Sequence, residues 1–219
     1  MLTALLVALA GALLAGAAAY WLRRRRLTAG HEALLAEPSR ASRVLVLGPA
    51  GAGKTTLLRH ALRQFARGAS RRSSAVTAQL GGPYAPTRGL VIVDANVRGL
   101  GVQLCDAGGG DAERRQWVAL VRGADVRAIV YVLDSADDSE LGRDLFRQLA
   151  LAPWAAGARL FVALNVRLAA DGADAACARR EAELRAAVPK PFGVVRLSAL
   201  HDSSAAVELI AEAAAAGEG

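Results

Sequence analysis

The residues of this sequence with the clearest chemical potential form one short run, GPAGAGKTT at positions 48–56. The run matches the pattern G-x-x-x-x-G-K-[ST], in which glycines let backbone N–H groups curl around a phosphate. Lys54 would reach the β- and γ-phosphates of a nucleotide, and the Thr55 hydroxyl would ligate Mg²⁺. The pattern therefore predicts a phosphate-binding loop (P-loop) whose nucleotide-binding residues are Gly48, Gly51, Ala52, Gly53, Lys54, Thr55 and Thr56.

The lysine in this run stands out against the rest of the chain. The sequence has 25 arginines and only two lysines, Lys54 and Lys190. A compact ammonium group enters a narrow loop more readily than a guanidinium group does, so a composition that favours arginine elsewhere keeps lysine here. The alternative interpretation, a glycine-rich turn that matches the pattern by chance, does not account for this choice.

Two later segments carry oxygen ligands that suit the same chemistry. Asp106 ends an apolar run and begins the segment DAGG. Its carboxylate can hold Mg²⁺ through water, and the N–H of Gly109 can reach a γ-phosphate. Thr87, in the segment PTRG, can close over Mg²⁺ and the γ-phosphate and so order its loop only when a triphosphate is bound. The expected metal ligands are therefore Thr55, Thr87 and Asp106.

Together these motifs resemble one known family. The segments PTRG at 86–89, DAGG at 106–109 and VLDS at 132–135 are similar to those of the Arf and Arf-like branch of the small GTPases, and the resemblance covers residues 43–214. It implies the Ras-like P-loop GTPase fold, GTP and Mg²⁺ as cofactors, and a switch that recruits partners at membranes. It also implies that Thr87 belongs to the first switch segment, and that Asp106 and Gly109 belong to the second.

The guanine-binding side departs from the family pattern. Where the family has N-K-x-D, this chain has NVRL at 165–168, so Leu168 replaces the aspartate that accepts hydrogen bonds from guanine. A buried site without its polar partner discriminates poorly, and guanine preference is expected to be weak. Ser198 and Ala199 stand where the family has S-A-K, and the Ala199 N–H could still face the guanine oxygen. We therefore expect Asn165, Ser198 and Ala199 at the base, with a P-loop ATPase or kinase as a further alternative.

Alternating strands and helices must position these residues. Short runs rich in valine and leucine predict six strands, at 43–48, 90–94, 101–106, 128–134, 159–165 and 192–197. Helical spacing of apolar residues predicts helices at 53–66, at 112–121, along Leu141, Leu145 and Leu149, at 173–188, and along Val207, Ile210, Ala211 and Ala214. This order predicts an α/β domain with a mostly parallel six-stranded sheet and helices on both faces. The ligand site is then expected at the carboxyl ends of the strands, and the polar segment 67–88 is expected to be a long loop.

The N-terminus differs from the rest of the chain. Residues 1–22 carry no charge, and at about 1.5 Å per residue they are long enough to cross a bilayer core of about 30 Å. Tyr20 and Trp21 suit the headgroup level, and four arginines follow at 23–26, which by the positive-inside rule puts the rest of the chain in the cytosol. A cleaved signal peptide is the alternative, but the positive block follows the apolar run instead of preceding it. We therefore expect a transmembrane helix at 1–22, a basic juxtamembrane linker at 23–42 and a small GTPase-like domain at 43–219.

Composition narrows the remaining possibilities. The two cysteines, Cys105 and Cys177, form no disulfide framework, and the chain fits a reducing compartment. Part of the formal net charge of +7 is the single arginine run. No basic groove interleaved with aromatic residues is visible, so direct nucleic-acid binding is not expected.

Two functional interpretations stay open within the resemblance. The first is a membrane-anchored Arf-like GTP switch that works with exchange and activating factors in protein transport. The second follows from the similarity of residues 127–136 to the β subunit of the signal recognition particle receptor. That Arf-related protein has an N-terminal membrane helix, lacks the catalytic glutamine, and holds GTP so that the receptor α subunit can dock. In both interpretations the chain is a single-pass membrane protein with its domain in the cytosol, and the second favours the endoplasmic reticulum.

Gly110 predicts slow hydrolysis of the nucleotide. The family has a glutamine here, which orients the attacking water, whereas glycine has no side chain, so we assign no catalytic residue from the sequence. Because the charge-stabilising residues are present but no group positions the water, intrinsic GTP hydrolysis is expected to be far slower than in a glutamine-bearing relative. Single-turnover hydrolysis measured beside such a relative, under the same conditions, checks this expectation, and comparable turnover would contradict it.

Overall fold

The computed structural model describes residues 42–65, 87, 89–121, 125–137, 139–166, 172–199 and 203–216. All of them lie in the second of the two units into which the chain divides, Ser39–Gly219. The expected membrane helix at 1–22, almost all of the linker at 23–42 and most of the loop at 67–88 lie outside the described residues. Among the helices that are described, none combines the length and the apolar character needed to cross a bilayer.

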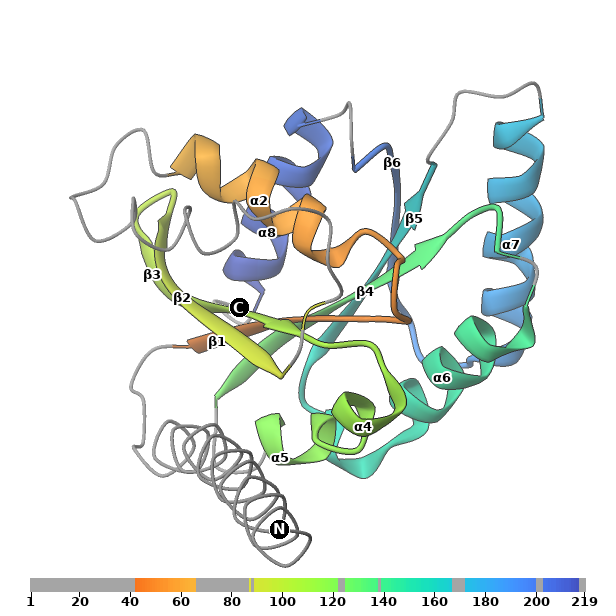
Figure 1. The fold of residues 1–219 in the computed structure, drawn as a ribbon, viewed down its shortest axis with the longest axis horizontal. Coiled ribbons are helices and arrows are strands. Elements are labelled where there is room, and N and C mark those ends of the chain that lie inside the picture. Colours follow the sequence, from red (N-terminus) through yellow and green to blue (C-terminus); the bar gives the residue numbers. More distant parts are fainter. Residues whose placement is uncertain are drawn as a thin grey trace, which may run out of the picture. The chain divides into compact units, whose positions relative to one another are not determined.

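Six strands form one sheet in which β1 has neighbours on both sides (Figure 1). The strands are β1 (Ser42–Leu47), β2 (Leu90–Val97), β3 (Leu100–Ala107), β4 (Val126–Asp134), β5 (Arg159–Asn165) and β6 (Gly193–Leu197). Their order is β2-β3-β1-β4-β5-β6, and every neighbouring pair is parallel except the antiparallel pair of β2 and β3. The predicted mostly parallel six-stranded sheet is confirmed.

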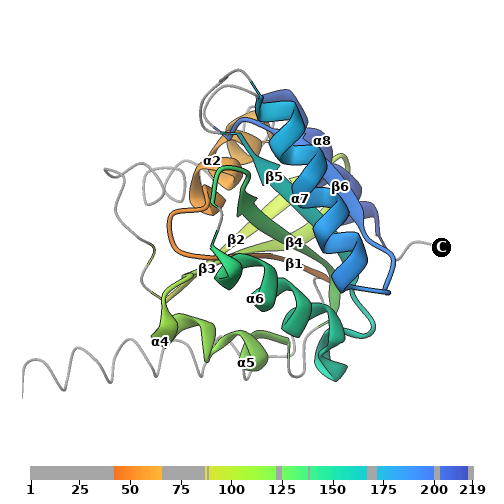
Figure 2. The same cartoon turned by 90° about the vertical axis from the view of Figure 1, so that its right-hand side faces the viewer.

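Helices cover both faces of this sheet, as predicted (Figures 1 and 2). They are α2 (Lys54–Phe65), α4 (Asp111–Arg114), α5 (Trp117–Val121), α6 (Glu140–Leu151), the short 3-10 helix η2 (Pro153–Ala155), α7 (Ala173–Ala187) and α8 (Ser203–Ala215). α2 and α8 pack against each other on one face, and α4, α5, α6 and α7 lie on the other. The sheet is therefore buried between two helical layers, which is typical of parallel strands.

The alternation of side chains along the central strands divides the core into two layers. Val44 and Val46 of β1, together with Val130 of β4, are fully buried in the cluster that α2 and α8 cover. Leu45 and Leu47 alternate with them and are equally buried, so they face the opposite layer. Each such side chain contributes about 1.5–3 kcal/mol relative to an exposed one, which explains why an unbroken apolar run forms this strand.

The opposite layer is organised around three aromatic rings. The ring centroids of Tyr131 and Phe146 are 5.2 Å apart, and Phe146 meets Phe192 edge to face at 5.1 Å. The Tyr131 hydroxyl donates a hydrogen bond of 2.8 Å to the carbonyl of Gly142, and burial raises the pKa of this hydroxyl. A Cβ at Gly142 would lie 2.4 Å from Cδ1 of Leu133, so the glycine allows α6 to approach β4 closely.

The helix predicted at 112–121 is instead two short helices, α4 and α5, with a turn between them. The N–H of Gln116 closes this turn on the carbonyl of Glu113 at 2.9 Å. Trp117 follows; it is buried, and its indole N–H donates to the carbonyl of Gly108 at 3.1 Å. The break therefore accompanies a contact with the loop after β3, which helical periodicity does not report.

The helix predicted along Leu141, Leu145 and Leu149 is confirmed as α6, but its buried face is partly different. Leu141 is 48% exposed, whereas Phe146 is fully buried and Leu149 nearly so. The close approach of Gly142 to β4 turns the Phe146 side of the helix inward. The leucine spacing therefore predicts the helix correctly, but it predicts Leu141 on the buried face, where the structure has Phe146.

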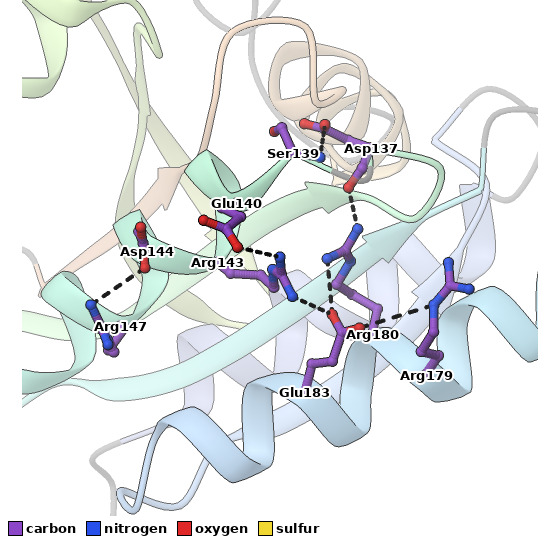
Figure 3. A network of polar contacts seen from close by, with 9 residues as sticks. All are labelled: Asp137, Ser139, Glu140, Arg143, Asp144, Arg147, Arg179, Arg180 and Glu183. Atoms are coloured by element: carbon purple, nitrogen blue, oxygen red, sulfur yellow. Dashed lines mark hydrogen bonds and ion pairs between the residues drawn. The ribbon is translucent and has the colours of Figure 1, made fainter.

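A buried arginine ties α7 to the loop after β4 (Figure 3). Arg180 is only 3% exposed, and its guanidinium donates to the backbone carbonyl of Asp137 and, at 3.0 Å, to Oε2 of Glu183. Arg143 of α6 donates to the same Glu183 oxygen at 3.2 Å. One carboxylate therefore joins α6 to α7, and Arg180 adds the loop after β4 to this network.

Replacing Arg180 by methionine is expected to lower the free energy of unfolding by about 2 kcal/mol, because it removes the buried donor to the partly buried carbonyl of Asp137 and one partner of Glu183. The matched control is Arg147→Met, whose ion pair with Asp144, at 3.4 Å, is about half exposed. That change is expected to stay within about 0.5 kcal/mol. Urea denaturation of both variants, followed by tryptophan fluorescence, measures the difference; equal losses would contradict a special role for the buried arginine.

Candidate functional site

The predicted site residues gather at the carboxyl edge of the sheet, around the end of β1. The P-loop follows β1 directly, and Asp106 of β3 pairs in parallel register with Val46 of β1. On the other side of β1, the ends of β4 and β5 meet at Asp134 and Asn165. β2 and β3 thus lie on one side of β1, and β4, β5 and β6 on the other. In α/β sheets such a switch point is where ligands bind, beyond the carboxyl ends of the strands.

Two glycines give the P-loop its shape. Gly48 has a φ of 143°, and a Cβ there would lie 2.2 Å from the carbonyl oxygen of Val132. Gly53 has a φ of 101°, and a Cβ there would lie 2.4 Å from Nδ2 of Asn165. This combination of positive φ and close approach suits glycine alone. The chain can therefore curve tightly between β1 and α2, whose first residue is Lys54.

Lys54 folds back onto the loop that precedes it. The side chain is 5% exposed, and its Nζ donates to the carbonyl oxygens of Gly48 at 2.9 Å and Pro49 at 2.7 Å. Burial lowers the pKa of Lys54 to about 8, and the nearby charge of Asp106 partly offsets this effect. The ammonium group therefore lies in a poorly solvated place, where an anionic phosphate would strongly favour its charged form.

Three oxygen-bearing side chains from separate segments converge at the end of β3. The Thr55 hydroxyl donates to Oδ2 of Asp106 at 2.6 Å and lies 2.7 Å from the Thr87 hydroxyl, which in turn lies 3.3 Å from the same carboxylate oxygen. Burial raises the pKa of Asp106, although hydrogen bonds from both threonines and the charge of Lys54 oppose this rise. The other oxygen of Asp106, Oδ1, is buried and has no hydrogen-bond partner in the described part of the chain.

This cluster has the chemistry of a magnesium site. Mg²⁺ prefers hard oxygen ligands and keeps several of its waters. Thr55 and Thr87 would hold the ion through their hydroxyls, and Asp106 would hold it through water, with the orphaned Oδ1 free to accept a hydrogen bond. When bound, the ion supplies positive charge that neutralises the phosphates of a nucleotide.

The loop after β3 lies directly against the P-loop. A Cβ at Gly109 would lie 2.4 Å from the carbonyl oxygen of Gly48 and 2.5 Å from the amide nitrogen of Ala50. Two side chains hold this loop from behind: Arg114 donates to the Gly109 carbonyl at 2.9 Å, and the Trp117 indole donates to the preceding carbonyl at 3.1 Å. The backbone of Gly109 is thereby fixed next to the phosphate-binding backbone.

On the other side of the P-loop, Asn165 connects three segments. Its Nδ2 donates to the carbonyl of Ala52 at 2.9 Å, its Oδ1 accepts from the N–H of Ala199 at 2.8 Å, and its own carbonyl accepts from the N–H of Ser135 at 3.0 Å. The Ala199 N–H, which the sequence predicts to face the guanine oxygen, donates to Asn165 in the structure. The hydroxyl of Ser198 is buried and has no hydrogen-bond partner within the described ranges.

All the predicted site residues are described, and they lie in two groups around the P-loop. The phosphate and metal group consists of Gly48, Gly51, Ala52, Gly53, Lys54, Thr55, Thr56, Thr87, Asp106 and Gly109. The base group consists of Asn165, Ser198 and Ala199, while Leu168 lies outside the described residues. Their roles toward a nucleotide stay predictions. Sequence reasoning missed the support that Arg114 and Trp117 give to the loop after β3, although both follow the DAGG segment closely.

The family model described as the ADP-ribosylation factor family matches residues 31–202. A comparison with curated proteins finds no match. The matched range includes both groups of predicted site residues, from the P-loop to Ala199.

Replacing Gly109 by alanine is expected to weaken nucleoside triphosphate binding by about tenfold or more, because the added methyl group collides with the P-loop backbone. Gly101→Ala is the matched control, since a Cβ there meets no atom within 4 Å and neither glycine has a positive φ. Titration of both variants with a fluorescent GTP analogue measures the effect, and urea denaturation reports folding. Equal affinities in two folded variants would show that this close approach is irrelevant to binding.

Proposed function

The chain belongs to the ADP-ribosylation factor family, and from this membership we propose that it is a membrane-anchored GTP-binding protein that serves as a nucleotide-dependent switch or docking subunit. Its setting would be protein targeting or trafficking at a membrane. The family consists of small GTPases that bind guanine nucleotides. The membrane attachment, the partner and the location go beyond the family and are the proposal itself.

The observation that carries this proposal is the hydrogen bonding of Thr87 into the cluster with Thr55 and Asp106. Thr87 is 32 residues from Thr55 along the chain, so its segment reaches the site independently of the P-loop. A nucleotide switch needs such a segment, whose position depends on the γ-phosphate and its metal ion. The Thr87 hydroxyl that makes these contacts is also a suitable magnesium ligand. This supports a Thr87 segment whose position responds to bound triphosphate.

Gly110 favours a docking subunit over a rapidly cycling switch. Its backbone, with φ −72° and ψ 165°, has an extended conformation that any residue can adopt, so the backbone conformation does not require glycine there. The chain has Lys54, which stabilises charge on the phosphates, but it lacks the glutamine that orients the attacking water. GTP is therefore expected to be hydrolysed slowly. GTP retained in the site would stabilise a surface for a second subunit. In this alternative the partner is the α subunit of a signal recognition particle receptor, and the location is the endoplasmic reticulum.

Membrane attachment is supported by the sequence alone. Residues 1–22 are uncharged and are followed at once by arginines 23–26. This arrangement favours a single membrane pass with the nucleotide-binding domain facing the cytosol. The arginines would also lie close to anionic lipid headgroups.

Few side chains in this site can select between guanine and adenine. Both polar ends of the Asn165 side chain are engaged within the protein, by Ala52 and Ala199. Leu168 supplies no carboxylate for guanine. Family membership favours guanine nucleotides, and ATP binding would instead support a P-loop ATPase or kinase.

Identification of the bound nucleotide tests the proposal. The full chain, purified in mild detergent, is denatured, and the released nucleotide is identified by chromatography. We expect retained GTP with little GDP, and a higher affinity for GTP than for ATP when both are titrated. Bound ATP, or equal affinity for the two purines, would contradict a guanine-nucleotide function while leaving the P-loop fold intact.

The two lysines provide a matched control for the same experiment. Lys54→Met is expected to abolish nucleotide retention, because it removes the buried ammonium at the P-loop. Lys190→Met is expected to keep the nucleotide, since Nζ of Lys190 donates to the carbonyls of Ala155, Ala156 and Ala158 and not to the P-loop. Co-purification of a large GTPase subunit in stoichiometric amount from solubilised membranes would favour the docking role over the cycling switch.

A further inference from the structure

The side chain of Glu113 lies over the glycine that replaces the family's glutamine. A Cβ built on Gly110 would lie 2.6 Å from Oε2 of Glu113 and 3.7 Å from its Cδ. A Cβ built on Gly108 would lie 2.5 Å from Cγ and 3.0 Å from Cβ of Glu113. The side chain therefore runs along the loop after β3 from Gly108 to Gly110, and its carboxylate ends where a side chain at position 110 would begin.

Local helix geometry explains this position. α4 begins at Asp111, directly after Gly110. Side chains on a helix lean toward its N-terminus, and residues three positions apart lie on the same face. Glu113 is therefore directed back over Gly110.

The carboxylate of Glu113 has free acceptor capacity. Within the described part of the chain it makes no hydrogen bond and no ion pair, whereas Asp111 of the same helix is paired with Arg114. Glu113 is partly exposed, so water can reach it. The Cβ position at Gly108 that meets Glu113 also lies 2.6 Å from the carbonyl oxygen of Thr87. Glu113 is thus beside both segments that are expected to contact a γ-phosphate.

We propose that Glu113 is a catalytic residue for GTP hydrolysis in this chain, and that its carboxylate accepts a hydrogen bond from the attacking water. This is the water-orienting role for which relatives use glutamine, and the inference rests on the proposed GTP-binding function. In the step, the water oxygen forms a bond to the γ-phosphorus while the bond from that phosphorus to the β–γ bridging oxygen breaks. GDP leaves with the bridging oxygen, one water proton stays on the released phosphate, and the other passes to solvent.

A carboxylate performs only part of the work of a glutamine. An amide can accept a hydrogen bond from water and also donate one, whereas an ionised carboxylate only accepts. Its negative charge also repels the γ-phosphate. Glu113 therefore sustains hydrolysis that is slow but measurable, in agreement with the slow turnover expected from Gly110.

Single-turnover hydrolysis of GTP by the full chain with Mg²⁺ tests the role of Glu113. Glu113→Ala is expected to lower the hydrolysis rate by about tenfold or more, because no acceptor remains for the water. Glu113→Gln is expected to keep the rate at or above that of the wild type, since the amide accepts from water without repelling the phosphate. Glu212→Ala, which removes an exposed carboxylate on α8, is the matched control and is expected to leave the rate unchanged.

GTP affinity, measured for each protein in the same experiment, separates the possible failures. A wild-type chain that does not bind GTP would overturn the proposed function. Normal GTP binding with an unchanged rate in Glu113→Ala would overturn the role of Glu113 alone. An equally large loss of hydrolysis rate in Glu113→Gln and Glu113→Ala would also overturn the role of Glu113. So would a wild-type chain that binds GTP and never hydrolyses it.

Discussion

A buried carboxylate at the end of β3 sets the arrangement of the phosphate side of the site. A charge removed from water is tolerated only where hydrogen bonds and opposite charge surround it. Asp106 is 1% exposed, and the hydroxyls of Thr55 and Thr87 and the ammonium group of Lys54 offset part of the cost of burying its charge. The parallel pairing of β1 with β3 makes this possible because it sets the two strand ends side by side. That register sets the P-loop beside the loop after β3, and the antiparallel pairing of Leu90 with Ala107 brings the Thr87 segment to the same edge.

The sheet could be predicted from the sequence because the information for it is local. Apolar runs bounded by polar residues mark the strands, and the run at 159–165 has the same bounds as β5. The two errors in the helices come from contacts between distant segments. Trp117 accompanies the break in one helix by donating to the loop after β3, and Phe146 replaces Leu141 on the buried face of α6, where Gly142 allows a close approach to β4. Hydrophobic periodicity carries no signal for such contacts.

The candidate site divides in the same way between local and tertiary information. Lys54, Thr55 and Asp106 could be named from residue type and spacing, because phosphate and magnesium chemistry restricts the choice at those positions. Glu113 could not be named, since its relevance depends on a helical turn that returns it to Gly110. The sequence alone shows that the glutamine is missing at position 110. The structure shows that the carboxylate of Glu113 lies beside that position.

The contacts of Asn165 and Thr87 have different consequences for the order of the two sides of the site. One side-chain amide joins the carbonyl of Ala52 to the N–H of Ala199, so both of its polar ends are engaged within the protein. The conformational entropy of ordering this side of the site is therefore lost during folding and not during binding. The opposite side is joined through hydroxyl–carboxylate contacts of Thr87, which a metal ion and phosphates would replace. A nucleotide bound there would meet, on its base side, a side chain already positioned by the fold, whereas the order of the Thr87 side would depend on the metal ion and the phosphates.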